Sequence, residues 1–147
     1  MKIERKFTKA GQDAYAELDF VTTSSEIRNP DGTIVFRLDE VEVPSAWSQV
    51  ASDVIAQKYF RKAGVPVAMK KVKEKGVPSF LWKSVAATDE TERTGETSSK
   101  QVFDRLAGAW TYWGWKVVYF TTEDDAQSYF DEMLHILATQ RASPNSP

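Results

Sequence analysis

The residues of this 147-residue chain that could do chemistry begin with its single histidine, His135. Asp131 and Glu132 precede it by four and three positions, so a carboxylate–imidazole pair is geometrically possible on a helix. A zinc site would need more than one histidine beside carboxylates, and no serine or cysteine nucleophile signature surrounds His135. The spacing therefore indicates a histidine on the surface of a helix.

The chain contains no cysteine. Disulfides, thiolate metal sites, cysteine nucleophiles and thiol redox chemistry within the chain are therefore excluded. The stretches "AGAW" and "WGW" lack the spacing of glycine-rich phosphate loops. Because the residues supply no convergent set of acid, base, nucleophile and metal ligand, we expect no catalytic residue and no metal site in this chain.

A basic tract over 58–75 offers a second kind of chemistry. Its cations lie beside Tyr59 and Phe60, and they are Lys58, Arg61, Lys62, Lys70, Lys71, Lys73 and Lys75. Proteins that bind single-stranded nucleic acid combine such cations with aromatic rings for phosphate attraction and base stacking. A solvated helix face has the same composition, and Glu74 interrupts the run. A small nucleic-acid-binding or protein-interaction module remains the alternative interpretation.

The tryptophan-rich segment "AWTYWGWK" is a third candidate, since aromatic side chains often anchor ligand sites. Phe103, Leu106, Trp110 and Trp113 recur at spacings of three, four and three, which is typical of one helix face. We therefore expect these rings to belong mainly to the core.

The composition limits the classes of protein that remain. The chain has 19 basic and 21 acidic residues, a formal net charge of −2, so it has no strong overall attraction for nucleic acid or anionic membranes. It is 41% hydrophobic and 12% aromatic, which is enough for the core of one domain. No stretch approaches the ~20 apolar residues of a membrane span. We expect a cytoplasmic protein.

The elements that must position these residues begin with a β-hairpin. Residues 14–21 and 34–43 are rich in alternating and β-branched positions, and "RNPDGT" between them supplies the residues of a tight turn at 29–32. Residues 2–7 are expected to add another short strand.

After Pro44 the apolar period becomes helical, and three helices are predicted. The apolar face of the first is formed by Trp47, Val50, Ala51, Val54, Ile55 and Lys58 or Tyr59, with Gly64 as its C-cap and Pro66 as its stop. The second follows in "SKQVFDRLAGAWTYWGW", where Gly114 can end it. The third begins with a capping box of Thr122 and Asp125, and its stripe is Ala126, Tyr129, Phe130, Met133, Leu134 and Leu137.

These elements predict an α+β fold, with an N-terminal β-hairpin followed by a small helical bundle of about three main helices. The single domain 1–147 divides into a hairpin part (1–44), a helix with a basic loop (45–86), a flexible loop (87–99), a helical pair (100–142) and an extended exit (143–147). The loop 87–99 has no aliphatic residue beyond its first alanine. The exit contains Pro144 and Pro147, which forbid helix.

Six blocks of the sequence stand out as an ordered set. They are "MKIERKFTKAG", "SEIRNPDG", "VPSAWSQVASDVIAQKYFRKAGVP", "GVPSFLW", "QVFDRLAGAWTYWGWK" and "YFDEMLHILATQRASPNSP". In this order they resemble the N-terminal region of the cobalamin-dependent (class II) ribonucleotide reductases of the long bacterial type. The resemblance covers nearly all of the chain except the loop 87–99.

The resemblance gives the exit 143–147 a meaning. In the family, the "PNSP" element continues into the first strand of a ten-stranded α/β barrel that holds the active site, so this chain would be an N-terminal piece of a longer enzyme: an engineered fragment, a split gene product or a gene remnant. Ser146, with Asn145 before it, matches the Ser or Thr before Pro that meets the substrate's phosphate side in related reductases. The alternative is that "PNSP" is only a helix-terminating turn.

The resemblance also implies the reaction, which reduces ribonucleoside diphosphates to 2′-deoxyribonucleotides, the precursors of DNA. Adenosylcobalamin produces a thiyl radical on a barrel cysteine, and a cysteine pair supplies electrons before a thioredoxin-like protein re-reduces it. Since this chain has no cysteine, it is expected to be inactive alone. Adenosylcobalamin is expected in the full-length enzyme and not on this fragment. Its expected partners are the reductase barrel, the ribonucleotide substrate and the reductant. An apolar face around Trp110, Trp113, Trp115 and the exit of the last helix is expected to favour self-association or docking of a partner.

One departure from the family concerns Val117 and Val118. They precede Tyr119-Phe120, where the resemblance implies small, glycine-like residues. Two β-branched residues prefer extended backbone, so the link between the last two helices is where we expect altered geometry.

Overall fold

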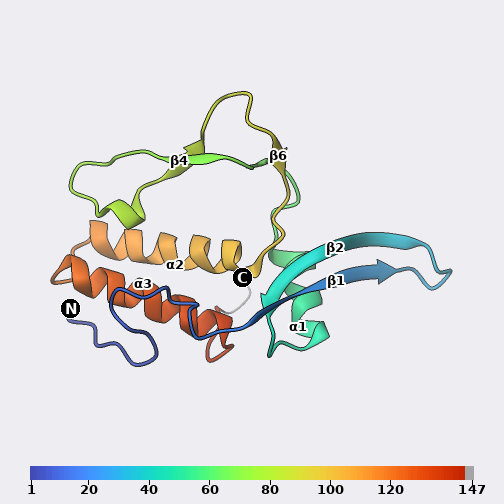
Figure 1. Cartoon of the computed structure of the whole chain (residues 1–147), viewed down its shortest axis with the longest axis horizontal. Coiled ribbons are helices and arrows are strands. Elements are labelled where there is room, and N and C mark those ends of the chain that lie inside the picture. The colour runs from blue at the N-terminus through green and yellow to red at the C-terminus, as the bar shows by residue number, and fades with distance from the viewer. Residues whose placement is uncertain (145–147) are drawn as a thin grey trace.

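The computed structural model describes residues 1–144. Figure 1 shows a long β-hairpin with a short helix at its base, next to a pair of long helices. The N-terminal segment lies along one side of the helix pair, and a second, smaller hairpin lies along another. This combination of an N-terminal antiparallel hairpin and three helices confirms the predicted α+β fold.

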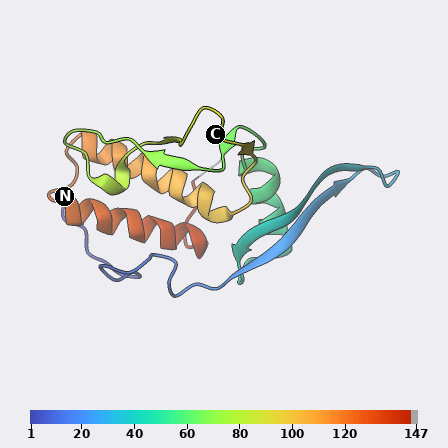
Figure 2. The same cartoon turned by 45° about the horizontal axis from the view of Figure 1, so that its top comes forward.

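The N-terminal hairpin consists of β1 (Phe20–Arg28) and β2 (Ile34–Pro44), which pair antiparallel. Its turn lies where the sequence predicts it: the N–H of Gly32, at φ +88°, donates to the carbonyl of Asn29 at 2.9 Å. Only the base of the hairpin is buried, around Val41. The tip projects beyond the rest of the molecule (Figure 2).

The predicted strand at 14–21 is wrong before Phe20. Asp13 starts a turn there, because its carboxylate accepts the N–H of Tyr15 at 2.9 Å and its carbonyl accepts that of Ala16 at 3.0 Å. An aspartate that bonds the backbone two residues on is a common turn former. The turn therefore replaces the first six residues of the predicted strand.

The predicted strand at 2–7 is also wrong. This segment runs extended along α3 (Glu123–Ala138), as Figure 1 shows. The backbone N–H of Ile3 donates to Asp125 Oδ1 at 2.8 Å, and that of Thr8 donates to Glu132 Oε1 at 2.8 Å. Since helix carboxylates accept these bonds in place of a neighbouring strand, no β-ladder forms.

The first helix is shorter than predicted and changes type. α1 (Gln49–Val54) continues as η1 (Ile55–Tyr59), a π-helical turn that the N–H of Phe60 closes on the carbonyl of Ile55 at 3.1 Å. Phe60 leaves in extended conformation, so the C-cap predicted at Gly64 is wrong. Gly64 instead takes a φ of +81° in the turn that follows.

The buried face of this helix also differs from the predicted stripe. Ile55 and Ala56 are buried as neighbours, and Ser52 faces the core with them. Val50 and Val54 are 72% and 47% exposed, although the helical pattern predicts them to face inward. Ser52, Ile55 and Ala56 have the spacing of one α-helical face, and this face is rotated from the predicted stripe, so that Val50 and Val54 lie outside it.

A smaller β-structure covers one side of the helix pair. It consists of β3 (Val65–Pro66) paired with β6 (Arg93–Thr94), and β4 (Met69–Lys71) paired with β5 (Ser84–Ala86), with the 3-10 turn η2 (Ser79–Leu81) between β4 and β5. Near its end Glu96 is buried. Its carboxylate accepts the N–H of Arg61 at 2.8 Å and a hydrogen bond from Arg105 Nη2 at 2.8 Å.

The two long helices hold most of the core. α2 (Ser99–Lys116) and α3 lie side by side and both begin with a capping box, so the box predicted at Thr122 and Asp125 is confirmed. The core residues that they share with the hairpin base and η1 are Val41, Val43, Ile55, Ala56, Phe60, Val102, Phe103, Ala107, Leu134, Leu137 and Ala138. Within residues 1–144 no helix is long and apolar enough to cross a bilayer.

α2 ends in a Schellman motif that places Val118 under strain. The N–H of Val118 donates to the carbonyl of Trp115 at 3.1 Å, and that of Tyr119 to Gly114 at 2.9 Å. This pattern needs a left-handed residue at Val118, which takes a φ of +59°. The prediction that Gly114 ends α2 is therefore wrong. Val118, one of the two valines where the family resemblance implies small residues, is the position at which glycine would be unstrained.

Val118→Gly is expected to stabilise the domain by about 1 kcal/mol. A β-branched residue in the left-handed region costs about 1–2 kcal/mol, and the greater freedom of glycine in the unfolded chain offsets part of the gain. Val118 is 82% exposed, so little packing is lost. Urea unfolding followed by tryptophan fluorescence measures the difference.

The matched control is Val117→Gly, because Val117 has an ordinary φ of −100° and is 64% exposed. It is expected to destabilise by up to about 1 kcal/mol. Equal effects of the two substitutions would contradict the strain at Val118.

Candidate functional site

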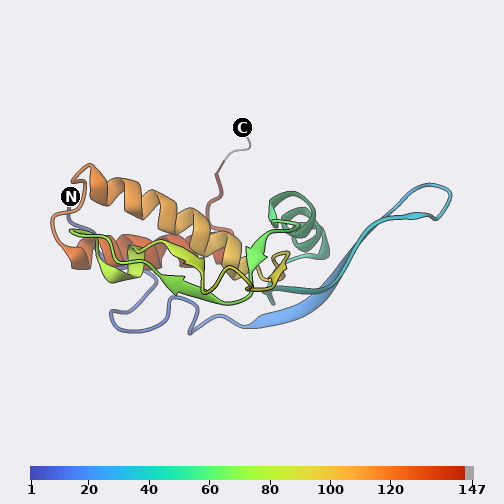
Figure 3. The ribbon, with the colours of Figure 1, turned by 90° about the horizontal axis from the view of Figure 1, so that it is seen from above.

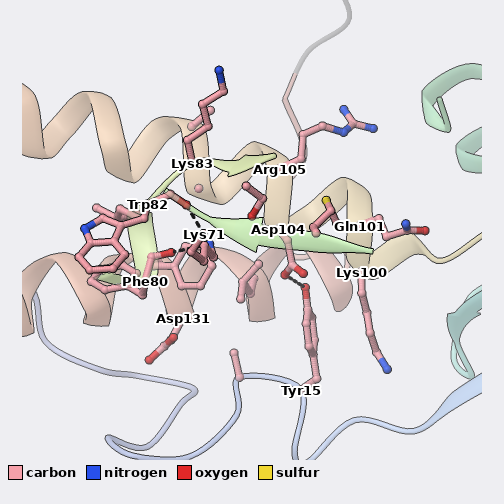
Figure 4. A pocket seen from close by; sticks show the side chains of 18 of the residues that line it. Tyr15, Lys71, Phe80, Trp82, Lys83, Lys100, Gln101, Asp104, Arg105 and Asp131 are labelled. Atoms are coloured by element: carbon pink, nitrogen blue, oxygen red, sulfur yellow. Dashed lines mark hydrogen bonds between the residues drawn. The ribbon is translucent and has the colours of Figure 1, made fainter. Parts of the chain in front are cut away.

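A large cavity lies between α2, the β4–β5 hairpin and the turn at 13–15. Its volume is about 1030 Å³, and Phe80, Leu81, Gly108, Phe130 and Leu134 give it an apolar floor. Figure 4 shows the polar side chains around it, which come from the N-terminal segment, β4, the residues just before β5, α2 and α3. These polar side chains determine which chemistry the cavity can support.

Tyr15 and Asp104 point toward one another across this cavity (Figure 4). The Tyr15 hydroxyl donates to Asp104 Oδ1 at 2.9 Å. Desolvation by the surrounding chain raises the pKa of Asp104, and the hydrogen bond from Tyr15 opposes that rise only in part. Desolvation, followed by the charge of Asp104, raises the pKa of the Tyr15 phenol. The phenol therefore stays protonated and donates to the carboxylate.

Other polar groups at this cavity are already paired within the chain. Lys71 Nζ donates to the carbonyl of Trp82 at 3.0 Å, and Arg105 is held by Glu96. Asp131 pairs with Arg5 Nη1 at 2.7 Å. These bonds hold the β4–β5 hairpin and the N-terminal segment against the helices, so they are structural contacts.

The Tyr15–Asp104 pair can therefore offer a ligand one further acceptor, Asp104 Oδ2, above an apolar floor. Lys83 extends away from this pair (Figure 4), whereas Lys100 Nζ lies 5.8 Å from the ring centre of Tyr15. In residues 1–144 no group of three or more histidine, cysteine or carboxylate side chains is placed to hold a metal ion. This arrangement can accept a hydrogen bond, but it brings no nucleophile, base and electrophile together.

His135 is not a free surface residue, in contrast to the prediction. Its ring stacks on Phe7 with centroids 5.2 Å apart and planes 6° apart. Desolvation, and then the charge of Arg141, lowers the pKa of His135. The carboxylates of Asp131 and Glu132, which the spacing placed near it, instead bind Arg5 and the backbone at 7–8. The histidine thus helps to hold the N-terminal segment.

The basic tract over 58–75 is exposed, but only one of its two aromatic side chains, Tyr59, is accessible for stacking. Phe60 is buried in the core. Lys62 donates to the carbonyl of Ala56 and lies 4.3 Å from the ring centre of Phe36. These contacts make the interpretation as a nucleic-acid-binding module less favourable, and it stays an alternative.

The tryptophans divide between core and surface. Trp110 packs against the core, and Trp115 Nε1 donates to the carbonyl of Gly76 at 2.7 Å. Trp113, predicted on the inward stripe, is 62% exposed, because Ala107, Thr111 and Gly114 form the buried face of α2 instead.

A second hollow, of about 490 Å³, lies between α1, η1, the first half of α2 and the residues after α3. We call it the α1–α2 groove. Its lining residues are Trp47, Ala51, Val54, Ile55, Tyr59, Val102, Phe103, Arg105, Leu106, Leu137, Gln140, Ala142, Ser143 and Pro144. Most of them are apolar, and sequence reasoning missed the groove because it depends on the π-helical turn.

The predicted substrate-binding residues, Asn145 and Ser146, lie outside the described residues. The structure therefore describes the path of the chain only as far as Pro144, which lies at the edge of the α1–α2 groove.

The described residues form an α+β domain that carries an apolar groove. Residues 21–140 match the family described as class II vitamin B12-dependent ribonucleotide reductase. The chain belongs to this family, as the sequence resemblance indicates.

The vitamin B12-dependent ribonucleotide reductase of Bradyrhizobium diazoefficiens is 62% identical over 154 residues, and that of Agrobacterium fabrum is 60% identical over 154 residues. That of Rhodopirellula baltica is 28% identical over 148 residues. Each match covers 100% of this chain and 12% of the relative. The chain thus spans about one eighth of the length of these reductases.

Proposed function

We propose that this chain is the non-catalytic N-terminal domain of a reductase that uses adenosylcobalamin to convert ribonucleoside diphosphates to 2′-deoxyribonucleotides. The observation that carries the proposal is the 62% identity to a vitamin B12-dependent ribonucleotide reductase over the full chain and only 12% of that relative. On this view the thiols of the reaction lie in the remaining polypeptide, because this chain has no cysteine.

The described residues do not fit the cobalamin itself. The only imidazole, His135, stacks on Phe7 and does not line the large cavity, where Lys71 and Arg105 are bonded within the chain. We therefore assign the cofactor, the ribonucleotide and a thioredoxin-like reductant to the rest of the reductase, which would act in the cytoplasm. Asn145 and Ser146 remain proposed contacts to the substrate's phosphate side.

A chimeric reductase tests this function. The matched N-terminal region of the Bradyrhizobium relative is replaced by this chain, and deoxyribonucleotide formation is measured with adenosylcobalamin and a dithiol. The chimera is expected to keep activity within about tenfold of the parent, whereas this chain alone and the parent without its N-terminal region lose more than that. Turnover by this chain alone, or a folded but inactive chimera, would contradict the proposal.

A further inference from the structure

The α1–α2 groove has an apolar wall that the domain leaves uncovered. Val50 and Val54 are exposed on α1, and Tyr59 in η1 is 46% exposed beside them. Ala51, Val54 and Tyr59 line the groove itself. Exposed apolar side chains on a helix beside a concave groove are typical of a surface that another part of a protein covers.

The walls of the groove are held in place by hydrogen bonds. Trp47, on one wall, donates from Nε1 to the carbonyl of Ala138 at the end of α3 at 2.7 Å. On the other side, Arg105 Nη2 donates to the carbonyl of Tyr59 at 2.9 Å. The groove is therefore a formed surface that needs little rearrangement to receive a partner.

The polypeptide leaves α3 directly into this groove. A left-handed turn at Gln140, at φ +55°, lets the N–H of Arg141 donate to the carbonyl of Ile136 at 3.0 Å and redirects the chain. Residues 142–144 then form part of the groove wall. Figure 3 shows this segment leaving between the helix pair and α1.

We propose that the α1–α2 groove is the surface onto which the catalytic part of the reductase packs, an inference that rests on the proposed function. The relatives continue for most of their length beyond the matched region, and the chain reaches the groove at Pro144. A partner tethered at that point has a high effective concentration at the groove. The occupant is thus an apolar face of the same polypeptide.

A competing surface lies at the turn between α2 and α3. Trp113, Val117, Val118 and Tyr119 are exposed there to a similar degree. Figure 1 shows that this turn lies at the opposite end of the helix pair from the exit of α3. A tether at Pro144 does not favour it, so it serves as the matched control surface.

Because this chain has no cysteine, a single thiol can report on each surface. Val54→Cys and Val117→Cys are introduced separately into the chimeric reductase, and alkylation of each site is followed by peptide mass spectrometry. The Val54→Cys thiol is expected to react at least tenfold more slowly in the chimera than in this chain alone. The Val117→Cys thiol is expected to react at similar rates in both.

Three results would overturn the proposal: equal alkylation of the Val54→Cys thiol in the two proteins, protection of only the Val117→Cys thiol, or protection in this chain alone that disappears on dilution. The last would show that a second copy covers the groove.

Activity of the chimera without cysteine substitutions reports on the proposed function separately. An active chimera with an unprotected Val54→Cys thiol refutes only the docking surface, and an inactive one with a protected thiol refutes only the function.

Discussion

Replacing Gly114 by alanine is expected to destabilise the domain by about 2 kcal/mol, although alanine is the better helix former. A Cβ atom at Gly114 would lie 2.7 Å from Cε2 and 3.0 Å from Cζ of Phe120. Phe120 is buried, and its ring contacts that of Tyr129 at a centroid distance of 5.3 Å, so it cannot move away freely. The steric overlap with Phe120 is therefore expected to destabilise the domain by more than the higher helix propensity of alanine stabilises it. Urea unfolding measures the loss.

Gly108→Ala in the same helix is the matched control. Its Cβ would lie 3.9 Å from Cε2 of Phe130, which is an ordinary contact. This substitution is expected to stabilise by up to about 1 kcal/mol. If both alanines stabilise the domain, Phe120 does not pack against Gly114 as described.

The features that sequence predicts correctly depend on residues close together in the chain. The capping box of Thr122 and Asp125 spans four residues, and the hairpin turn at 29–32 is set by its own Pro, Asp and Gly. In each case the residues that donate and accept the hydrogen bonds lie within the motif itself. Predictions of this kind hold because no distant element is needed to complete them.

The failed predictions concern residues whose partners lie far away in sequence. Residues 2–7 have the pattern of a strand, but the carboxylates that accept their N–H groups lie more than 120 positions later. Val50 and Val54 fit a helical stripe, but the face that packs against the hairpin base and α2 carries Ile55 and Ala56 instead. Gly114 resembles a helix terminator, whereas its actual role is to make room for Phe120.

The candidate sites were even less accessible to sequence reasoning. Tyr15 and Asp104 are separated by 89 positions, and neither belongs to a motif. The α1–α2 groove requires the end of α3 to meet η1, which no local pattern states. The family could be predicted from the sequence, because six blocks in the same order are more specific than any single motif.

Substituting Glu132 by glutamine is expected to release the N-terminal segment from α3 and to cost about 2 kcal/mol of stability. The buried Glu132 carboxylate accepts the N–H of Phe7 at 3.1 Å, and the N–H and hydroxyl of Thr8 at 2.8 and 2.6 Å. Glutamine loses the charge and turns an NH₂ group toward donors. Hydrogen exchange at the Thr8 amide is expected to accelerate at least tenfold.

Glu123→Gln is the control, since Glu123 is exposed in the first turn of the same helix. It is expected to change stability by no more than about 0.5 kcal/mol and to leave the Thr8 amide protected. Unchanged protection in Glu132→Gln as well would show that the carboxylate does not hold the segment.

The same carboxylates predict how stability depends on pH. Desolvation would raise the pKa of Glu132, but hydrogen bonds from Thr8 and from the backbone outweigh it, so the pKa is lowered. The N–H of Ile3, followed by Thr122, lowers the pKa of Asp125. A lowered pKa means stability that is complete above the unfolded values of about 4 and is lost as the pH falls through the folded values.

His135 adds a loss of stability at higher pH. Its pKa is lower in the folded chain than the unfolded value of about 6.5, so the unfolded chain takes up the proton first and folding becomes less favourable below that pH. The domain should therefore lose stability in two stages on acidification, first below about pH 6.5 and then below about pH 4. Unfolding midpoints measured from pH 8 to pH 3 separate the stages. His135→Phe keeps a ring for Phe7 to stack on and should remove the first stage. Glu132→Gln should weaken the second stage and deepen the first, because the Glu132 charge raises the pKa of His135. The two stages would then be assigned to separate contacts of one segment, since both residues meet the chain at Phe7.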